Sequence, residues 1–436
     1  MTGIQRACLE ILAEAEQHYG ASGRVGFCRL NLKTQEFERV EFSAILEKYA
    51  CPPPWHRFGT PGQRRARAAD VMSALRHLPR YVGVGILPGL SRWILRRFRG
   101  GRRASFLRPG DVIICLGAAW YNERYGRSIE AAKRDWQVRF VVLIHDLIPL
   151  TQASYVHHAL RVAFCDWIRE VLTPADLVLT VSRHSREELI AAAQTYGWTL
   201  PPLEIIRLGA TFKQWRPRVA TEPAVTEECA STPFVLCVSS IEPRKNQLLL
   251  VEVWRRLIAR HGDDRVPDLV CIGRFFGPSE SLRKQLLPRD GMGGKFRLLS
   301  DLSDGELSDT YRHCLFTVYP SFCEGWGLPV AESLAQGKFC IASDRTSLPE
   351  VGGDFIDYFD PGDIEDALAK IERPLLDPAY LAVREAHIRE AYRPPSWSDC
   401  TRSLIEIVDR AFGSTTPSAK TAARHALRDG ERRAHS

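Results

Sequence analysis

The sequence has little that points to a disulfide-bonded or metal-binding protein. Its twelve cysteines are scattered over 436 residues, none forms a C-x-x-C pair, and no histidine–cysteine cluster has the spacing of zinc ligands. No run of about 18 apolar residues is present, so no transmembrane helix is expected. The first residues are amphipathic and acidic, unlike a signal peptide. We therefore expect a cytosolic protein in which cysteine serves mostly as a small apolar residue.

Acidic residues are almost absent from one segment. The chain carries a net charge of +7, yet residues 61–110 contain twelve arginines and a single acid, Asp70. Within this segment, residues 81–103 interleave arginines with Trp93, Phe98 and aliphatic residues, a pattern typical of segments that lie on anionic membranes. No helix-turn-helix, zinc module or RNP-like motif accompanies it, which argues against nucleic acid as the partner. We expect contact with an anionic membrane surface, and a solvated basic loop without a partner is the alternative.

Short apolar runs alternate with helix-like stretches along most of the chain. After an expected helix over 4–19 and two short strands over 24–32 and 37–45, the sequence contains three candidates for buried strands before residue 200 and four after residue 230. These candidates are 111–117, 140–146, 175–182, 234–240, 268–274, 316–321 and 339–344. Continuous apolar strands that alternate with helices indicate parallel sheets covered by helices on both faces. The predicted fold class is α/β.

Changes in composition indicate the domain boundaries. Residues 216–233 are rich in Pro, Thr, Glu and Ala and read as a linker. The simplest arrangement is two Rossmann-like domains that face each other across a cleft, an N-terminal one over 1–215 and a C-terminal one over 234–390. Helices over 391–412 are expected to pack back on the N-terminal domain. The polar, basic tail over 413–436 is expected to be disordered.

Two glutamates separated by seven residues, Glu324 and Glu332, follow the predicted strand 316–321. Ligands of open α/β sheets bind beyond the carboxyl ends of the strands. A helix is expected to begin at Pro329, and no Ser, Thr, Asp or Asn precedes it to cap its free N–H groups. Such an uncapped start with nearby glycines is suited to a phosphate group. The alternative is an ordinary helix start that is capped by water.

Polar residues also follow two other predicted strands. Arg244 and Lys245 come after strand 234–240, where two cations could grip a diphosphate. A surface turn with two solvated cations is the alternative. His145 and Asp146 end the predicted strand 140–146. A histidine at the carboxyl end of a strand can be structural or functional, and both interpretations stay open.

Together these segments resemble the retaining GT-B glycosyltransferases of family 4, and among them bacterial mannosyltransferase-like members. The E-x7-E pair is Glu324 and Glu332. The other matching segments are LIHDLIPL (143–150), TVSRHSREEL (180–189), EPRKN (242–246), IASDRTSLPEVGGD (341–354) and YFDPGD (358–363). The resemblance covers nearly the whole chain except residues 50–110 and the tail.

The resemblance implies a diphosphate site. Arg244 and Lys245 would neutralise the donor diphosphate, and the amides near Gly325, Gly327 and Leu328 would bind its oxygen atoms. Fixed cations can stabilise a departing diphosphate without a metal. No spaced pair of aspartates stands at a strand end to hold Mg²⁺, so neither a metal nor another cofactor is expected.

The resemblance also implies contacts to the sugar and the nucleoside. Glu332 would accept hydrogen bonds from the ribose hydroxyls, and Glu324 would contact the hydroxyls of the transferred sugar. His145 would touch the donor sugar or the acceptor from the other domain. Residues 2–6 (TGIQR) resemble the glycine-containing loop after the family's first strand, which would bring Gly3 near the donor. No strand precedes this loop, so either the start site is placed too late or another segment replaces the strand.

The implied function is transfer of a hexose from a nucleotide-diphosphate sugar, with GDP-mannose as the first donor to test. The acceptor would be a glycan or a polyprenyl-linked glycan in the synthesis of a cell-surface polysaccharide such as lipopolysaccharide. The enzyme would be peripheral on the inner face of the plasma membrane. An inactive scaffold subunit that binds a nucleotide sugar is the alternative, although the presence of Lys245, Glu324 and Glu332 argues against it. A nucleotide-sugar epimerase or phosphorylase is less consistent with the matching motifs.

Overall fold

A computed structural model describes residues 3–50, 106–212 except 118 and 121, 232–276, 280–286, 292 and 294–413. By its internal contacts the chain forms two compact units, one of Met1–Val25 and Arg108–Ser436 and one of Gly26–Leu107. The N-terminal domain predicted over 1–215 therefore includes parts of both units. Nearly all of the basic segment 61–110, the linker 216–233 and the tail 413–436 lies outside the described residues.

The smaller unit contains a hairpin followed by a helix. Strands β1 (Phe27–Leu30) and β2 (Phe37–Val40) pair antiparallel, and helix α2 (Phe42–Ala50) follows. The prediction of a strand over 37–45 was wrong beyond Val40. Phe42, Ile45 and Leu46 recur at a spacing of three to four residues, which favours a helix over a strand.

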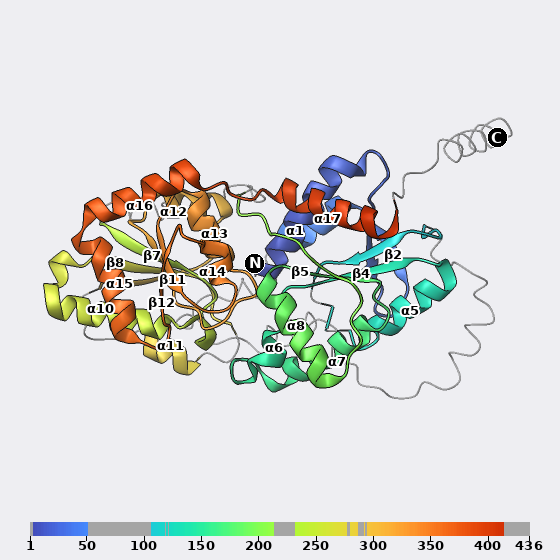
Figure 1. Ribbon diagram of the computed structural model, residues 1–436, viewed down its shortest axis with the longest axis horizontal. Coiled ribbons are helices and arrows are strands. Elements are labelled where there is room, and N and C mark those ends of the chain that lie inside the picture. Colours follow the sequence, from blue (N-terminus) through green and yellow to red (C-terminus); the bar gives the residue numbers. More distant parts are fainter. Residues whose placement is uncertain are drawn as a thin grey trace, which may run out of the picture. The chain divides into compact units, whose positions relative to one another are not determined.

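The first sheet of the larger unit has four parallel strands in the order β3-β4-β5-β6. Its strands are β3 (Val112–Cys115), β4 (Arg139–Ile144), β5 (Leu177–Thr180) and β6 (Leu203–Ile205). The helical segments along this part of the chain are α1 (Gly3–Ala15), η1 (Glu16–Gly20), α5 (Tyr125–Trp136), α6 (Ile148–Thr151), η3 (Ala153–Tyr155), α7 (His158–Leu172) and α8 (Arg183–Tyr196). In the described part of the chain, β3 has a strand partner only on the β4 side. Figure 1 shows helices on both faces of this sheet.

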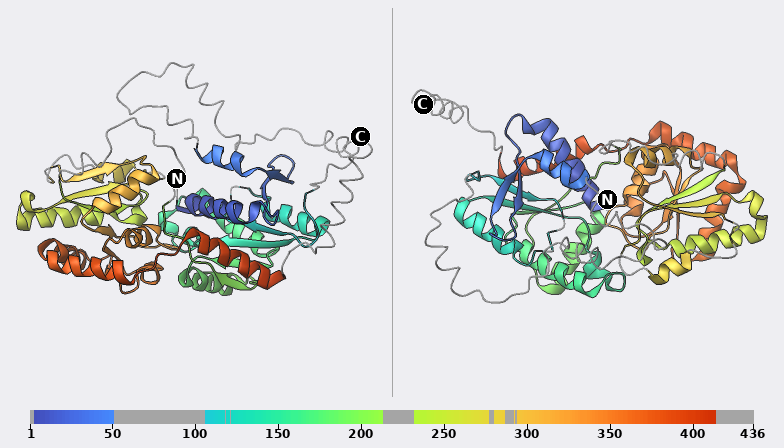
Figure 2. Two further views of the ribbon diagram at one scale, coloured as in Figure 1. Left: turned by 90° about the horizontal axis from the view of Figure 1, so that it is seen from above. Right: turned by 180° about the vertical axis from the view of Figure 1, so that it is seen from behind.

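The second sheet has six parallel strands in the order β12-β11-β10-β7-β8-β9. Its strands are β7 (Phe234–Val238), β8 (Asp268–Ile272), β9 (Phe296–Leu299), β10 (Thr317–Tyr319), β11 (Cys340–Ser343) and β12 (Asp357–Phe359). The helical segments along this part of the chain are η4 (Pro243–Lys245), α10 (Gln247–His261), η5 (Asp263–Arg265), α11 (Glu280–Leu286), α12 (Asp304–His313), α13 (Leu328–Ala335), α14 (Leu348–Gly352), α15 (Ile364–Leu376), α16 (Pro378–Ala391) and α17 (Trp397–Phe412). The two parallel sheets flanked by helices confirm the predicted α/β class (Figures 1 and 2).

The sequence prediction omitted three strands, β6, β9 and β12. All three are edge strands, and their residues are mostly half-buried. An edge strand has a neighbour on one side only, so it does not need the continuous apolar run that marks an interior strand. The seven predicted strands correspond to β3, β4, β5, β7, β8, β10 and β11.

The C-terminal helix α17 packs along α1 (Figure 1). The Thr401 hydroxyl donates to the carbonyl oxygen of Ile11 at 3.5 Å, and the indole N–H of Trp397 donates to the carbonyl oxygen of Thr211 at 3.0 Å. A Cβ atom at Gly209 would lie 2.6 Å from Trp397, so the absence of a side chain there allows this close packing. Among the helices of the described residues, none is both long and apolar enough to span a membrane.

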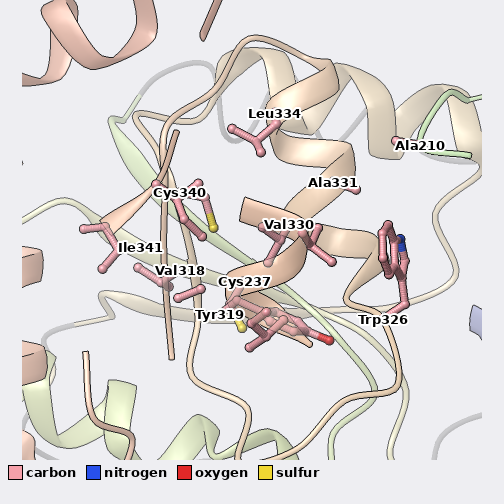
Figure 3. Packing of buried hydrophobic residues seen from close by; sticks show 14 of the residues in the cluster. Ala210, Cys237, Val318, Tyr319, Trp326, Val330, Ala331, Leu334, Cys340 and Ile341 are labelled. Atoms are coloured by element: carbon pink, nitrogen blue, oxygen red, sulfur yellow. The ribbon is translucent and has the colours of Figure 1, made fainter. Parts of the chain in front are cut away.

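Helix α13 is held against the second sheet by buried apolar side chains. Val330 and Leu334 of α13 belong to the same buried cluster as Val318 of β10 and Ile341 of β11 (Figure 3). This packing leaves the N-terminal end of α13 at the carboxyl edge of the sheet, where Glu324 lies.

Candidate active site

Glu324 is at the centre of a buried cluster of charges at the carboxyl edge of the second sheet. Its side chain lies in the loop between β10 and α13 and meets both cations of η4, which follows β7. Lys245 Nζ is 2.5 Å from Glu324 Oε1, and Arg244 Nη1 is 3.1 Å from Oε2. The hydroxyl of Tyr319 donates to Oε1 at 3.0 Å and accepts from Lys245 Nζ at 2.8 Å. Two strands that are neighbours in the sheet therefore bring these four residues together.

These contacts determine the ionisation of the cluster. Burial raises the pKa of Glu324, but the charges of Lys245 and Arg244 outweigh it and lower that pKa to about 2. Burial, together with the neighbouring Arg244, lowers the pKa of Lys245 from its ordinary value. Burial also opposes the charge of Arg244, yet Glu324 and Glu242 raise its pKa above the ordinary value. Glu324 is therefore a carboxylate at neutral pH, paired with a permanent arginine charge.

Further hydrogen bonds fix Arg244 in this position. Its Nη2 donates to Glu242 Oε1 at 2.8 Å, and its Nη1 donates to the carbonyl oxygen of Cys323 at 2.5 Å. The N–H of Phe322 donates to the carbonyl oxygen of Arg244 at 2.9 Å. The 3₁₀ turn after β7 and the loop after β10 are thus joined through side chain and backbone, which holds Glu324 rigidly.

The turn into α13 requires glycine. Gly327 has φ of 119°, a conformation that L-residues rarely adopt, and a Cβ atom there would lie 2.6 Å from Leu348 Cδ2. Helix α13 begins at Leu328, one residue before the predicted start at Pro329, and no side chain caps it. The N–H groups of Val330 and Ala331 donate to the carbonyl oxygen of Gly327.

The free donors of the turn lie before Pro329, which has no N–H. Within the described residues, the backbone N–H groups of Gly325, Gly327 and Leu328 donate to no protein acceptor. These are the amides that were predicted from the sequence to bind the oxygen atoms of the diphosphate. The next donors, in the first turn of α13, are already used by the backbone.

Gly325 lies in close contact with the loop that follows β4 and contains His145. A Cβ atom at Gly325 would lie 2.2 Å from the carbonyl oxygen of His145 and 2.8 Å from Asp146 Cβ. The hydroxyl of Ser185 in α8 lies between them, 3.2 Å from the carbonyl oxygen of His145 and 3.3 Å from that of Gly325. The matching segment 180–189, in which Ser182 also caps α8, is therefore part of the contact between the loops that follow β4 and β10.

His145 is buried, and its ring is oriented by the backbone. Nε2 lies 2.8 Å from the carbonyl oxygen of Leu116, which requires a proton on that nitrogen. Burial lowers the pKa of His145, and the hydrogen bond to Leu116 opposes this effect. At neutral pH the ring is therefore uncharged with Nδ1 as its acceptor. The neighbouring Asp146 has its pKa raised by burial to about 6, despite the nearby charge of Arg244.

Glu332 lies in α13 and belongs to a second buried cluster. Arg6 Nη1 of α1 is 2.6 Å from Glu332 Oε1, and the hydroxyl of Tyr311 in α12 donates to Oε2 at 3.1 Å. Burial raises the pKa of Glu332, while Arg6 and Tyr311 act in the opposite direction. Gly3 begins α1 nearby, and a Cβ atom there would lie 3.6 Å from Leu328 Cδ1.

The structure thus brings Arg244, Lys245, Glu324 and Glu332 to one edge of the second sheet in two groups, while His145 follows β4 of the first sheet and Gly3 begins α1. One group surrounds Glu324, the other surrounds Glu332, and the start of α13 connects them. Tyr311 and Tyr319, the two tyrosines that hold these carboxylates, were not predicted from the sequence, and neither was the contact of Arg6. The only signal for Tyr319 is its position at the end of a buried strand. Among the described residues, no three His, Cys, Asp or Glu side chains are placed to hold a metal ion.

The two parallel sheets flanked by helices place the chain among proteins with the GT-B fold. The pattern of the family "Glycosyl transferases group 1" matches residues 220–393. O-antigen chain mannosyltransferase B of Escherichia coli is 30% identical over 271 residues, which cover 61% of this chain and 69% of that protein. The chain belongs to the glycosyl transferases group 1 family and is a glycosyltransferase.

Two further comparisons show how far the similarity extends. The serotype-specific mannosyltransferase WbdA of Escherichia coli is 27% identical over 326 residues, 71% of this chain, but the match spans only 38% of the length of WbdA. The structure of HepE from Anabaena in complex with UDP and glucose aligns with a TM-score of 0.57 at 16% identity, covering 93% of this chain and 96% of that one. The structural similarity confirms the predicted GT-B fold.

Proposed function

We propose that the protein is a retaining, metal-independent hexosyltransferase of family 4 that takes mannose from GDP-mannose. The observation that carries the proposal is the Glu324 carboxylate, kept ionised by Lys245 and Arg244 beside the uncapped start of α13. This arrangement presents an acceptor for sugar hydroxyls on the same loop as donors for a diphosphate. The names of the relatives, which include mannosyltransferases of O-antigen synthesis, support mannose as the sugar.

The proposed reaction exchanges two bonds on one face of the sugar. The bond between C1 and the diphosphate oxygen breaks, and a bond from the acceptor oxygen to C1 forms on the same face. The acceptor proton passes to the leaving phosphate oxygen, so no protein base is required. Lys245 uses two of its three N–H donors on Glu324 and Tyr319, which leaves one for the diphosphate. Together with the amides of Gly325, Gly327 and Leu328, it would stabilise the charge that develops on the leaving group.

The proposed acceptor is a growing glycan, free or linked to a polyprenyl lipid, in the synthesis of a cell-surface polysaccharide. His145 would contact the donor sugar or this acceptor. The basic segment 61–110 would hold the enzyme at the anionic inner face of the plasma membrane. Nucleic acid is not a proposed partner.

A donor screen tests the proposal. Isothermal titration with GDP-mannose and with UDP and dTDP sugars, all in EDTA, should show tight binding of GDP-mannose alone. Lys245→Ala should weaken this binding about 10- to 100-fold, because a charged hydrogen-bond donor is lost. Lys133→Ala is the matched control, since Lys133 pairs with Asp176 at 2.8 Å on the first sheet. Equal affinity of Lys245→Ala and the wild type would reject the diphosphate assignment.

Turnover separates the enzyme from an inactive scaffold. Incubation with GDP-mannose and a polyprenyl-linked acceptor should give a product in EDTA, and its anomeric configuration by NMR should match that of the donor. Tight donor binding without product from any glycan acceptor would favour the scaffold. An inverted product would reject the same-face reaction.

A further inference from the structure

The Glu332 carboxylate is held from the opposite end of the chain. Arg6 of α1 donates to Oε1 at 2.6 Å across 326 positions of sequence, while Tyr311 of α12 donates to Oε2. The side chains of Arg6 and Glu332 are 12% and 4% exposed, so this ion pair is largely shielded from water. A buried pair in this geometry fixes the carboxylate more firmly than a surface pair would.

Aromatic rings complete the surroundings of the guanidinium. The Arg6 Cζ atom lies 4.5 Å from the centroid of the Phe212 ring, and that ring contacts the ring of Tyr311 at 5.7 Å. The attraction between a guanidinium and an aromatic face offsets part of the cost of dehydrating the cation. Arg6 is therefore held in place by packing and can serve as a fixed support for Glu332.

Arg6 also has donors that the protein does not use. Its Nε and Nη2 atoms are buried and have no hydrogen-bond partner in the part of the chain that the structure describes. Buried donors are normally paired, so unpaired ones indicate a site that a ligand completes. The unpaired amides at Gly327 and Leu328 lie at the start of the same helix that carries Glu332.

We propose that Arg6 is a positioning residue of the donor site, which holds the Glu332 carboxylate ready to accept the ribose hydroxyls of the bound nucleotide. This proposal rests on the proposed function, because it assigns Glu332 to the ribose. Helix α1 would then be part of the nucleotide site. The other predicted contacts to the donor lie on α13 and η4, which are segments of the chain around the second sheet.

Ionisation provides the physical reason for such a support. A buried carboxyl tends to be neutral, and a neutral Glu332 would accept hydrogen bonds from a ribose less strongly than a carboxylate does. The groups that face Glu332 are Arg6 of α1, Tyr311 and Asp304 of α12, with Glu10 close to Arg6. Arg6 is the only cation among these four groups. Its removal should therefore favour the neutral acid.

The test compares a nucleotide with its analogue that lacks the ribose hydroxyls. GDP and 2′,3′-dideoxy-GDP are titrated into the wild type, Arg6→Met, Arg6→Lys, Glu332→Gln and the double variant Arg6→Met/Glu332→Gln. If UDP binds more tightly than GDP, the UDP pair is used instead. Arg24→Met is the matched control, because Arg24 forms an ion pair with Asp409 of α17 and does not contact Glu332.

We expect the wild type and Arg24→Met to bind the ribonucleotide about 10-fold or more tightly than the dideoxy analogue. Hydrogen bonds to a charged acceptor contribute an affinity of this size. Arg6→Met and Glu332→Gln should each lose most of this preference, while their affinity for the dideoxy analogue stays within about threefold of the wild type. The double variant should lose no more than either single one, and Arg6→Lys should restore part of the preference. In Arg6→Met, ribonucleotide affinity should rise with pH as Glu332 loses its proton.

Two outcomes would overturn the proposal. If Arg6→Met keeps the preference for the ribonucleotide and Glu332→Gln loses it, Glu332 binds the ribose but Arg6 does not position it. Equal loss of both nucleotides in Arg6→Met shows a purely structural ion pair. If Arg6→Met does not fold, two other variants still decide whether Arg6 positions Glu332. These are Arg6→Lys and the double variant, which carries no unpaired buried charge. An unchanged preference in Glu332→Gln would instead contradict the proposed function.

Discussion

Replacing Glu324 by glutamine should change how the stability of the protein depends on pH. The pKa of Glu324 falls from 4.5 to about 2 in the folded protein. One pKa unit corresponds to about 1.4 kcal/mol, so the ionised carboxylate contributes about 3 kcal/mol of stability. Because its pKa is lowered by folding, this contribution is present above pH 4.5 and is lost as the pH falls toward 2. By pH 3, about half of it should remain.

Urea unfolding followed by tryptophan fluorescence at pH 7, 5, 4 and 3 measures this effect. The difference in unfolding free energy between the wild type and Glu324→Gln should shrink by about 1.5–2 kcal/mol between pH 5 and pH 3. Loss of the Glu324 partner of Lys245 adds a further cost in the variant. Glu252→Gln, which removes a partly exposed carboxylate of α10, serves as the control. A difference that stays constant from pH 5 to pH 3 would refute the assignment of a buried, paired carboxylate.

Two other predictions test the loop contact and the basic segment. Gly325→Ala should destabilise the protein by about 1–3 kcal/mol and reduce transfer activity, since the added Cβ atom would meet the backbone of His145 at 2.2 Å. Gly26→Ala, where an added Cβ meets nothing within 4 Å, should behave like the wild type, and equal melting temperatures for both variants would contradict the close contact. Deletion of residues 81–103 should release the protein from anionic liposomes in a flotation assay and leave donor binding unchanged. Liposome binding that survives the deletion would reject the membrane role of this segment.

All interior strands of the two parallel sheets could be predicted from the sequence, while three of the edge strands could not. Val141, Val142 and Leu143 of β4 are fully or almost fully buried, and the sequence shows a continuous apolar run there. Apart from Phe359, the residues of β9 and β12 are only partly buried at the two edges of the second sheet, so these strands lack a continuous run of buried apolar residues. The parallel α/β class follows from the interior strands alone, because each of them must be covered by helices on both faces.

The Glu324 site could be predicted in outline, because its residues lie in two short segments that follow neighbouring strands. The strand order brings Lys245 and Glu324 together, and alternating strands and helices already imply such an order. The buried Arg6–Glu332 pair could not be predicted in this way. It joins residues 326 positions apart, and no local pattern near Arg6 indicates which carboxylate it meets.

The balance of charges around Glu324 limits how a diphosphate can bind. Arg244 and Lys245 face two carboxylates, Glu242 and Glu324, so the four side chains together carry no net charge. A diphosphate that enters such a site meets no net excess of positive charge, so neutral donors must supply part of its stabilisation beside the remaining N–H donor of Lys245. The amides before Pro329 supply such donors, and the dipole of the short helix α13 adds a favourable field. We therefore expect binding to depend on the backbone conformation at Gly327 as well as on the two cations, because only a residue that tolerates φ of 119° keeps the turn before Pro329 in this conformation.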